Sequence, residues 1–322
     1  PGKVVISGEY AVLDGAPAIA AAVTPRARVS VRSSDGPQHT ITSKRYKDVQ
    51  GEFRCDEGNF EWLAGGDAFG IVEQAWQATR LSTPTAVAID IDTSEFFDPG
   101  SNTKLGLGSS AALMTALTAA LVQLAGNEAD VATTARVGHR NFQHGVGSGV
   151  DVACSTHGGL LRFRVVDPEP VPLMWPEGLR YALFWSGVPA STTARLKSLS
   201  QQAPKPSRVA LDEAAVSAAA AWSAGSAAGV VAEMHRYTEA LRRFSIDHDL
   251  GIFDAGHHGL LTDMDASVVY KPCGAGCGDV GMALATSRDA LAEFADRASA
   301  ANFMRLDIEF EPHGYQVARE LD

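Results

Sequence analysis

Residues 104–112 read KLGLGSSAA, and an almost wholly apolar stretch that runs to Leu124 follows the two serines. The stretch is long enough for a buried helix, and Gly126 marks its end. Glycines before a helix let the backbone approach a ligand closely. The free N–H groups at the helix start, together with the helix dipole, attract anions. The sequence therefore predicts an anion-binding turn, and its members are Gly106, Leu107, Gly108, Ser109, Ser110 and Ala111.

Ser109 and Ser110 allow two further interpretations. Either hydroxyl can cap the helix, which is the purely structural explanation of a glycine turn followed by serine. Either can also bind a metal ion held by phosphates. Two better-known phosphate loops fit less well. No G-x-x-x-x-G-K-[ST] string occurs, and the G-x-G-x-x-A match at Gly106 follows a loop-like segment (DPGSNTKL) where a dinucleotide site needs a strand.

Three other glycine-rich segments have the composition of ligand-binding turns. Residues 1–13 (PGKVVISGEYAVL) contain Lys3, and residues 147–151 (GSGVD) put Asp151 near a helix start, where an acid is also a common terminal residue. Residues 271–279 (KPCGAGCGD) lie between two predicted strands, as either a flexible hairpin or a wrap around a ligand. The chain opens without Met, so we expect a few preceding residues to be missing and no targeting segment.

The composition excludes several classes of protein. The chain has 322 residues, 45% of them hydrophobic and 20% charged, which suits about two folded domains and excludes a disordered protein. Its 27 basic and 38 acidic residues give a formal net charge of −11, which disfavours nucleic-acid and membrane partners. No stretch reaches the roughly 18 apolar residues of a membrane-spanning helix. Four cysteines are too few and scattered for a disulfide framework or a zinc site, which is typical of a cytoplasmic protein.

Other catalytic chemistries lack their motifs. No G-x-S-x-G or H-E-x-x-H string is present. His139 and His144 are five residues apart and would not share a helix face, and His257 and His258 are adjacent. We therefore expect these histidines to be structural or solvent-facing.

Hydrophobic periodicity predicts alternating strands and helices, which indicates an α/β (α+β) protein. Strands are expected at residues 4–6, 18–23, 26–31, 85–91, 160–166, 181–185, 266–270, 280–285 and 304–310, and helices at 66–80, 109–124, 129–143, 209–221, 228–244 and 287–300. Residues 40–60 are polar and read as a hairpin or loop region. A proline-rich run at 167–172 reads as a joint, so we expect one domain at residues 1–170 and a second at 171–322.

Taken together, the glycine-rich segments resemble the GHMP kinase family, which is named after galactokinase, homoserine kinase, mevalonate kinase and phosphomevalonate kinase. The family carries a PGK…GEYAVL opening, a GLGSSAA phosphate loop and a late GAGGG loop, and this chain has a close counterpart of each in that order. The resemblance implies the GHMP kinase fold. That fold has an N-terminal α/β domain with a left-handed βαβ crossover, a ferredoxin-like C-terminal domain, and an active site in the cleft between them.

Four stretches are most similar to the branch of the family that phosphorylates 5-phosphomevalonate. They are residues 143–153 (QHGVGSGVDVA), 157–163 (HGGLLRF), 185–192 (WSGVPAST) and 274–279 (GAGCGD). The mevalonate-phosphorylating branch usually carries a magnesium-binding Glu eleven residues before the catalytic Asp, and this chain has Arg140 at that position. Cys277 replaces a loop glycine, and Val150 replaces the usual Phe.

The resemblance implies phosphoryl transfer from ATP to 5-phosphomevalonate, which gives 5-diphosphomevalonate for isoprenoid synthesis, with ATP and Mg²⁺ as cofactors. Lys3 and Asp151 are the implied catalytic residues, and Ser109 and Ser110 lie near magnesium. The residues expected to bind the substrates are Lys104, Ser148, Gly149, Ser191, Thr192, Arg195, Gly274, Ala275 and Gly276. The oligomeric state stays open, with a homodimer as one option.

The charge of the acceptor phosphate indicates the separate roles of Lys3 and Asp151. A phosphate monoester is largely ionised at neutral pH, so we expect Lys3 to carry more of the catalysis and Asp151 to orient Lys3 or the metal. We expect a locally positive cleft in an acidic protein. The alternatives are a kinase of mevalonate or another small molecule from the same family, a diphosphomevalonate decarboxylase, and a family member that binds ligand without turnover.

Overall fold

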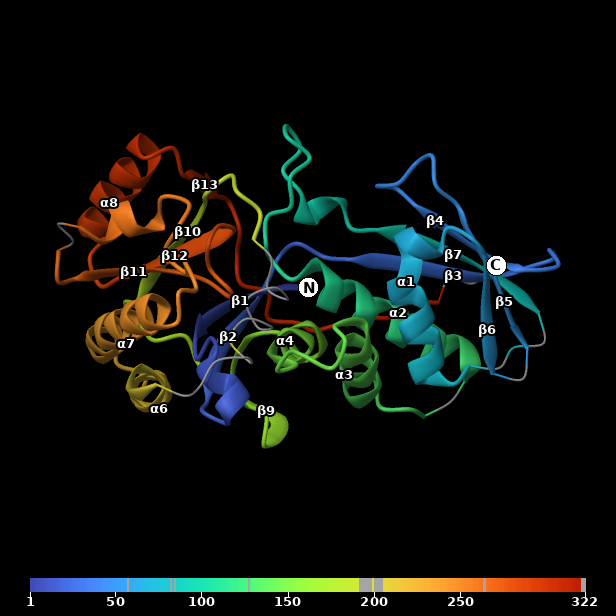
Figure 1. Ribbon diagram of the computed structural model, residues 1–322, viewed down its shortest axis with the longest axis horizontal. Coiled ribbons are helices and arrows are strands. Elements are labelled where there is room, and N and C mark those ends of the chain that lie inside the picture. The colour runs from blue at the N-terminus through green and yellow to red at the C-terminus, as the bar shows by residue number, and fades with distance from the viewer. Residues whose placement is uncertain are drawn as a thin grey trace.

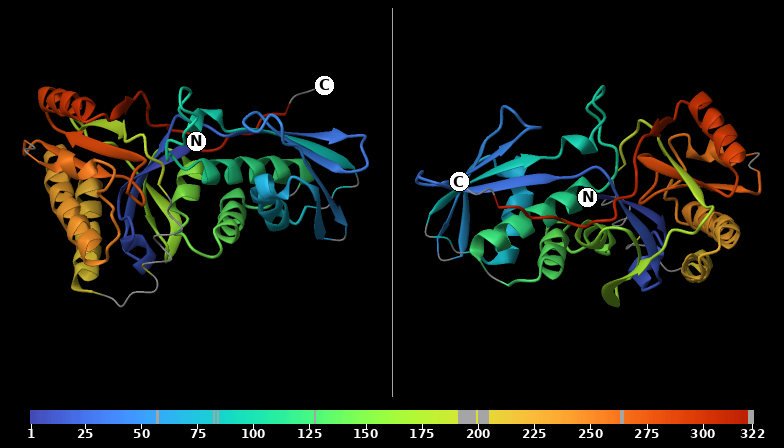
Figure 2. Two further views of the ribbon diagram at one scale, coloured as in Figure 1. Left: turned by 45° about the horizontal axis from the view of Figure 1, so that its top comes forward. Right: turned by 180° about the vertical axis from the view of Figure 1, so that it is seen from behind.

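The computed structural model describes residues 1–56, 58–81, 83, 85–126, 128–190, 199, 205–262 and 265–319. The molecule is elongated, with a group of strands and helices at each end and the N-terminal strand near the middle (Figures 1 and 2). Sheets and helices are mixed throughout, so the expected α/β (α+β) class is confirmed.

The middle of the molecule is a four-stranded antiparallel sheet in the order β1-β2-β8-β9. Its strands are β1 (Gly2–Ser7), β2 (Ala18–Val23), β8 (Leu160–Arg164) and β9 (Asp167–Leu173), and a short 3-10 helix, Ala11–Asp14, joins the first two. The proline-rich run that we expected to be a joint is therefore strand β9. Prolines fit there because an edge strand has one row of N–H groups that needs no partner. The strand spans the expected boundary between residues 170 and 171, and the division into domains stays a prediction.

A five-stranded sheet lies at one end of the molecule, in the order β3-β7-β4-β5-β6. Its strands are β3 (Arg28–Ser34), β7 (Ala86–Asp92), β4 (His39–Ser43), β5 (Gly51–Asp56) and β6 (Asn59–Ala64). The expectation of a hairpin or loop at residues 40–60 was thus too weak, because buried Ile41 and Phe53 alternate with the polar residues of genuine strands. β4 and β7 are parallel, and the handedness of their connection stays a prediction.

Helices α1 (Gly66–Thr79) and α2 (Ser109–Ala125) pack against this sheet, α3 (Val131–Phe142) packs on both of them, and α4 (Val150–His157) packs against the middle sheet. The long helix α2 contacts all three others as well as β1 and β3, which explains why it is apolar on most sides. A 3-10 helix at Ser94–Phe96 lies in the loop that precedes the glycine turn. Among the described residues, no helix combines the length and the apolar character needed to span a membrane.

The C-terminal part has a four-stranded antiparallel sheet in the order β11-β12-β10-β13. Its strands are β10 (Arg180–Trp185), β11 (Val268–Pro272), β12 (Val280–Ala285) and β13 (Met304–Leu306). Helices α6 (Pro206–Ala224) and α7 (Ala227–Asp247) and a 3-10 helix, His257–Leu261, come between β10 and β11, and α8 (Arg288–Ala300) connects β12 to β13. In chain order the strands lie fourth, first, third, second across the sheet, which is the expected ferredoxin-like arrangement.

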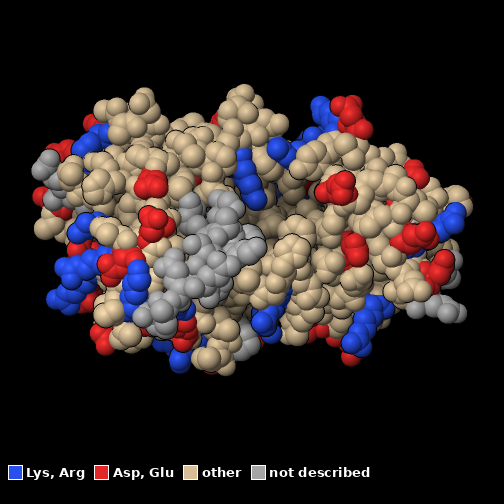
Figure 3. All heavy atoms as spheres, in the orientation of Figure 1, with Lys and Arg blue, Asp and Glu red and all other residues tan. Residues whose placement is uncertain are grey.

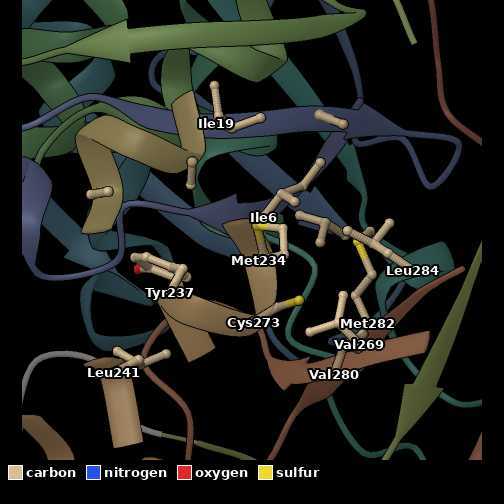
Figure 4. Packing of buried hydrophobic residues seen from close by; sticks show 14 of the residues in the cluster. Ile6, Ile19, Met234, Tyr237, Leu241, Val269, Cys273, Val280, Met282 and Leu284 are labelled. Atoms are coloured by element: carbon tan, nitrogen blue, oxygen red, sulfur yellow. The ribbon is translucent and has the colours of Figure 1, made fainter. Parts of the chain in front are cut away.

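One hydrophobic core joins the N-terminal part of the chain, which includes the middle sheet, to the C-terminal part. Ile6 and Ile19 of the middle sheet pack in the same cluster as Met234 and Tyr237 of α7 and Met282 of β12 (Figure 4). Because the cluster is continuous, β1 is held firmly between the N-terminal helices and the C-terminal sheet.

The end of the chain returns to the N-terminal part. The strand expected at residues 304–310 is only three residues long, and the chain then runs back alongside β2 (Figure 2). Glu311 N donates to Ala22 O (2.9 Å), Gly159 N donates to Glu311 O (2.8 Å), and Arg26 pairs with the Glu311 carboxylate at 3.0 Å. The sequence pattern did not indicate this return, because the segment makes isolated contacts and no regular ladder.

Candidate functional site

The glycine turn and the start of α2 form one wall of a cleft between the two parts. Gly106 and Gly108 have φ angles of +84° and +80°, in the left-handed region that favours glycine. A Cβ at Gly106 would stand 2.3 Å from Cβ of Asp279, and one at Gly108 would stand 2.8 Å from Cγ of Lys3. Both glycines are therefore required by their backbone conformation and by the close approach of their neighbours.

Lys3 bridges the two loops that face each other across the cleft. Its backbone N–H donates to Leu107 O (2.8 Å), which fixes β1 against the glycine turn. Its side chain runs along Gly108, and its Nζ lies 3.7 Å from the place where a Cβ of Gly274 would stand. The ammonium group is thus held between the first anion-binding turn and the late glycine loop.

Asp151 stands in the first turn of α4 and lines the same cleft. Its Oδ1 accepts a hydrogen bond from Val152 N (2.9 Å) and lies 3.8 Å from Nδ1 of His139. The other ring nitrogen of His139, Nε2, lies 3.1 Å from Oγ of Ser110. A buried imidazole therefore links the starts of α2 and α4.

His139 is 1% exposed, and we had expected it to be structural or solvent-facing without a place in the site. A signal for its position exists in the sequence. His139 follows Val131 and Ala135 at intervals of four residues, so it belongs to the buried face of α3. Arg140, the residue at the spacing of the family's magnesium-binding Glu, is exposed and its Nε donates to Gly145 O (3.3 Å).

Lys104 also reaches the cleft, and burial lowers its pKa. The negative charge of Asp279 opposes this shift in the pKa of Lys104, and the positive charges of Lys3 and Arg45 add to it. Because two other cations act on Lys104, an anion bound beside it would be favoured by charge, although the side chain is itself exposed to solvent.

The cleft carries both signs of charge, and the expectation of a locally positive cleft applies only to the part near the glycine turn. Its described lining holds two lysines, Lys3 and Lys104, but three carboxylates, Glu9, Asp151 and Asp279. Basic and acidic side chains are also interspersed over the face shown in Figure 3. The lysines lie near the glycine turn, so the positive charge is local to the predicted phosphate position.

One of those carboxylates, Glu9, is neutralised by the protein itself. Lys271 donates to Glu9 Oε1, and Tyr237 OH donates to Glu9 Oε2 (2.7 Å). All three side chains are buried, so the ion pair has its hydrogen bonds satisfied within the protein. Lys271, the first residue of the segment 271–279, thus anchors the C-terminal part to the N-terminal part.

The late glycine loop is held by both parts of the molecule. Tyr10 OH donates to Ala275 O (2.7 Å), and Cys277 N donates to Ile252 O (2.8 Å). Cys277 adopts a φ of +62° and is absent from the described lining of the cleft, so its side chain does not narrow the site. His257 supports the loop from behind, since its Nε2 lies 3.1 Å from Gly278 O.

The structure brings most of the predicted site residues together. Those that line the cleft are Lys3, Lys104, Gly106, Gly108, Ser110, Ser148, Asp151, Gly274 and Ala275. Leu107, Ser109 and Ala111 are buried beneath the turn, and Gly149 and Gly276 lie beside the cleft without lining it. Ser191, Thr192 and Arg195 lie outside the described residues. The sequence did not single out Glu9, Tyr10, Gln143 or Val146, which also line it.

No group of three or more His, Cys, Asp and Glu side chains within the described ranges is arranged to hold a metal ion. Oxygen donors are nevertheless present at the cleft, namely the Ser110 hydroxyl and the carboxylates of Asp151 and Asp279. The arrangement suits a hard cation that an anionic ligand brings with it, since such cations keep much of their shell on phosphate and water.

Comparisons with known proteins show which proteins this chain is similar to. Residues 71–159 match the family model of the GHMP kinases N terminal domain. The chain is 27% identical to the phosphomevalonate kinase of Streptomyces sp. (strain CL190) over 88% of both chains. It is 31% identical to the mevalonate kinase of Pyrococcus horikoshii over 54% of this chain and 52% of that protein. The fold is similar to that of Streptococcus pneumoniae phosphomevalonate kinase in complex with phosphomevalonate and AMPPNP, with a TM-score of 0.74, 19% identity, and coverage of 96% of this chain and 98% of that one.

Proposed function

The chain belongs to the GHMP kinase family, and we propose that it transfers the γ-phosphoryl group of ATP to 5-phosphomevalonate, which gives ADP and 5-diphosphomevalonate. The observation that carries the choice of acceptor is the extent of the similarity. Sequence similarity to the phosphomevalonate kinase covers 88% of both chains, whereas sequence similarity to the mevalonate kinase covers about half of each. The cleft is lined by residues of both parts of the chain, such as Ser148 and Gly274, so similarity over the whole chain is the better guide to the acceptor.

The residues present fit the triphosphate of ATP. The turn at Gly106 and Gly108 lets the side chains of Asp279 and Lys3 approach its backbone closely, and the N–H groups at the start of α2 suit an anion bound beside them. Lys3 extends across the turn, and Ser110 opens to the cleft. Ser109 is buried, so we assign the cleft-facing hydroxyl to Ser110 and keep Ser109 as part of the turn.

The residues present also fit a magnesium ion that arrives with ATP. Ser110 and Asp151 offer oxygen donors, which magnesium prefers. When bound, magnesium neutralises charge on the phosphates and stabilises the charge that develops during transfer. Arg140 leaves no carboxylate at the family spacing, but the Asp151 carboxylate lies 3.8 Å from Nδ1 of His139, whose Nε2 lies 3.1 Å from Ser110 Oγ.

The main requirement of the proposed phosphoryl transfer is to compensate the negative charges of ATP and the acceptor. The acceptor is a phosphate monoester whose second pKa is about 6, so its attacking oxygen needs little help from a base at neutral pH. Two anions must be brought together instead, and Lys3 is placed between the glycine turn and the late loop to reduce their repulsion. Asp151 orients Lys3 or the metal in this scheme, rather than removing a proton.

Lys104 is the proposed partner of the acceptor phosphate. It lines the cleft beside the turn, and the positive charges of Lys3 and Arg45, which help to lower its pKa, would be offset by a nearby dianion. Ser148, Gly274 and Ala275 line the same cleft and stay proposed acceptor contacts. Ser191, Thr192 and Arg195 belong to the same proposal on the resemblance alone.

An assay over several acceptors tests the function. ADP release is measured with 5-phosphomevalonate, mevalonate, homoserine and galactose, and carbon dioxide release is measured with diphosphomevalonate. The proposal predicts the highest kcat/KM with 5-phosphomevalonate. A higher kcat/KM with mevalonate would establish the second candidate, which the 31% identity over the shared half favours. Carbon dioxide release would identify a decarboxylase.

The roles of the two catalytic residues are tested separately. Lys3→Met removes the cation and Asp151→Asn keeps the size of the side chain while removing its charge. We expect Lys3→Met to reduce kcat more. A much larger loss in Asp151→Asn, without weaker metal binding, would contradict the assignment and indicate a general base.

A further inference from the structure

We propose that His139 is a positioning residue that sets the hydroxyl of Ser110 as an oxygen ligand for the nucleotide-bound metal and ties it to Asp151. The proposal rests on the proposed function only in that ATP and a divalent cation use this cleft. The identity of the acceptor does not enter it.

The placement of His139 comes from the packing of three helices. Helix α3 carries the ring on its last turn, and α3 packs against both α2 and α4. The side chain is 2% exposed and reaches Ser110 on α2 and Asp151 on α4, so one ring contacts the starts of both helices. A purely packing role would not need a polar ring at a position facing two polar groups.

The partners determine which ring nitrogen carries the proton. The Asp151 carboxylate offers only acceptor oxygens, so a proton on Nδ1 of His139 is the favourable arrangement at that side of the ring. A neutral ring then has Nε2 as an acceptor, and the Ser110 hydroxyl donates to it across 3.1 Å. The tautomer is assigned from these partners.

The consequence concerns the lone pairs of Ser110. A hydroxyl whose proton is directed at His139 presents its oxygen lone pairs to the cleft, which is the orientation a cation requires. Without an acceptor behind it, the same hydroxyl turns and donates to a phosphate oxygen. His139 thus selects between two uses of one serine, as groups behind a metal ligand commonly do.

The same ring also lies beside the carboxylate of Asp151 at the start of the neighbouring helix α4. Asp151 is held from one side by Val152 N (2.9 Å) and faces His139 Nδ1 on the other (3.8 Å). This link accounts for a buried histidine between two helix starts that carry the proposed oxygen donors.

Three variants separate the two contacts of the ring. His139→Gln places an amide near the position of Nε2 and keeps an acceptor for Ser110. His139→Asn has a shorter side chain whose amide reaches toward Asp151 but not Ser110. His139→Leu removes both contacts.

The readout is nucleotide binding without turnover. Calorimetry measures the dissociation constant of a non-hydrolysable ATP analogue with Mg²⁺ and with EDTA, and the ratio of the two constants reports the metal contribution. We expect His139→Leu and His139→Asn to reduce this ratio by about tenfold or more, and His139→Gln to keep it within about threefold of the wild type. Ser110→Ala should reduce the ratio similarly and should not add to His139→Leu.

A matched control is His39→Gln. His39 is also buried, and its Nδ1 accepts from Val87 N (3.1 Å) in the five-stranded sheet, away from the cleft. This variant should lower the unfolding temperature but leave the Mg²⁺/EDTA ratio unchanged. Circular dichroism confirms folding for each protein, and if His139→Leu does not fold, the comparison of Gln with Asn decides.

Two results would overturn the proposal. The first is a wild-type ratio in folded His139→Leu, and the second is equal behaviour of the Gln and Asn variants. Because no acceptor is present in this experiment, its failure is distinct from that of the proposed function, which fails when the wild-type protein does not release ADP with 5-phosphomevalonate.

Discussion

The change Gly108→Ala tests whether the glycine turn exists to place Lys3. Gly108 has a φ of +80°, and a Cβ there would stand 2.8 Å from Cγ and 3.1 Å from Cε of Lys3. The left-handed conformation costs alanine about 1–2 kcal/mol relative to glycine. Lys3 must also move by about 0.6 Å to restore an ordinary contact near 3.4 Å. Because misplacement of a reacting group by about 1 Å can cost about a hundredfold in rate, we expect kcat to fall by about ten- to a hundredfold.

Gly126→Ala is the matched control for this prediction. Gly126 ends the same helix with a φ of +61°, and no atom of another residue comes within 4 Å of the place where its Cβ would stand. Its alanine variant carries a similar backbone cost and should lower the unfolding temperature by a few degrees, as Gly108→Ala does. Its kcat should stay at the wild-type value.

The two measurements are ADP release at saturating substrates and thermal unfolding by calorimetry. Equal losses of activity in Gly108→Ala and Gly126→Ala would refute the reasoning, because both variants share the strain and only one meets Lys3. A wild-type kcat in Gly108→Ala would refute it as well.

Three further predictions concern titratable side chains. Lys104→Met should raise the KM for the acceptor by about ten- to a hundredfold, which corresponds to the loss of one charge-assisted hydrogen bond. The KM for ATP should change little, and an increase confined to the KM for ATP would contradict the assignment. Burial lowers the pKa of His257 to about 4. Between pH 6.5 and 4 the native state therefore binds fewer protons than the unfolded chain, so about 3 kcal/mol of the free energy of unfolding is lost as the pH falls through that range. Urea denaturation at several pH values should show this loss in the wild type and not in His257→Asn. Burial and the nearby charge of Asp14 raise the pKa of Asp212 to about 6, so ionisation of this carboxyl destabilises the native state as the pH rises from about 4 to 6. After allowance for solvent screening, Asp212→Asn should raise the free energy of unfolding by about 1 kcal/mol at pH 7.5 and leave it unchanged at pH 3.5. A lower unfolding temperature of the variant at pH 7.5 would contradict this.

Local patterns predicted the elements of the fold well where periodicity is strong. The apolar run after Ser110 is helix α2, and its start beside two left-handed glycines agrees with the expected turn. The expectation that the proline-rich run is a joint was wrong because proline disfavours a central strand but is tolerated in an edge strand such as β9. The weaker alternation of residues 40–60 concealed strands whose stability comes from the helices packed against them.

The residues of the candidate site divide in the same way. Lys3, Ser110 and Asp151 belong to short glycine-rich strings whose chemistry is visible in the sequence, and the structure brings them to one cleft. His139 was overlooked because its string, GHRNF, resembles any polar helix end. Its importance depends on which neighbours α3 receives, and no string of residues within that helix contains this information.

The amino-acid sequence by itself determined that this protein has glycine turns before helices, a helix apolar enough to be buried, and an order of motifs typical of one kinase family. Only the tertiary structure decided that Lys271 neutralises Glu9, 262 residues away, and that His139 joins Ser110 to Asp151. The reason is physical. Turns and helices depend on interactions over a few residues, whereas these contacts depend on how helices and sheets pack once the common core has formed.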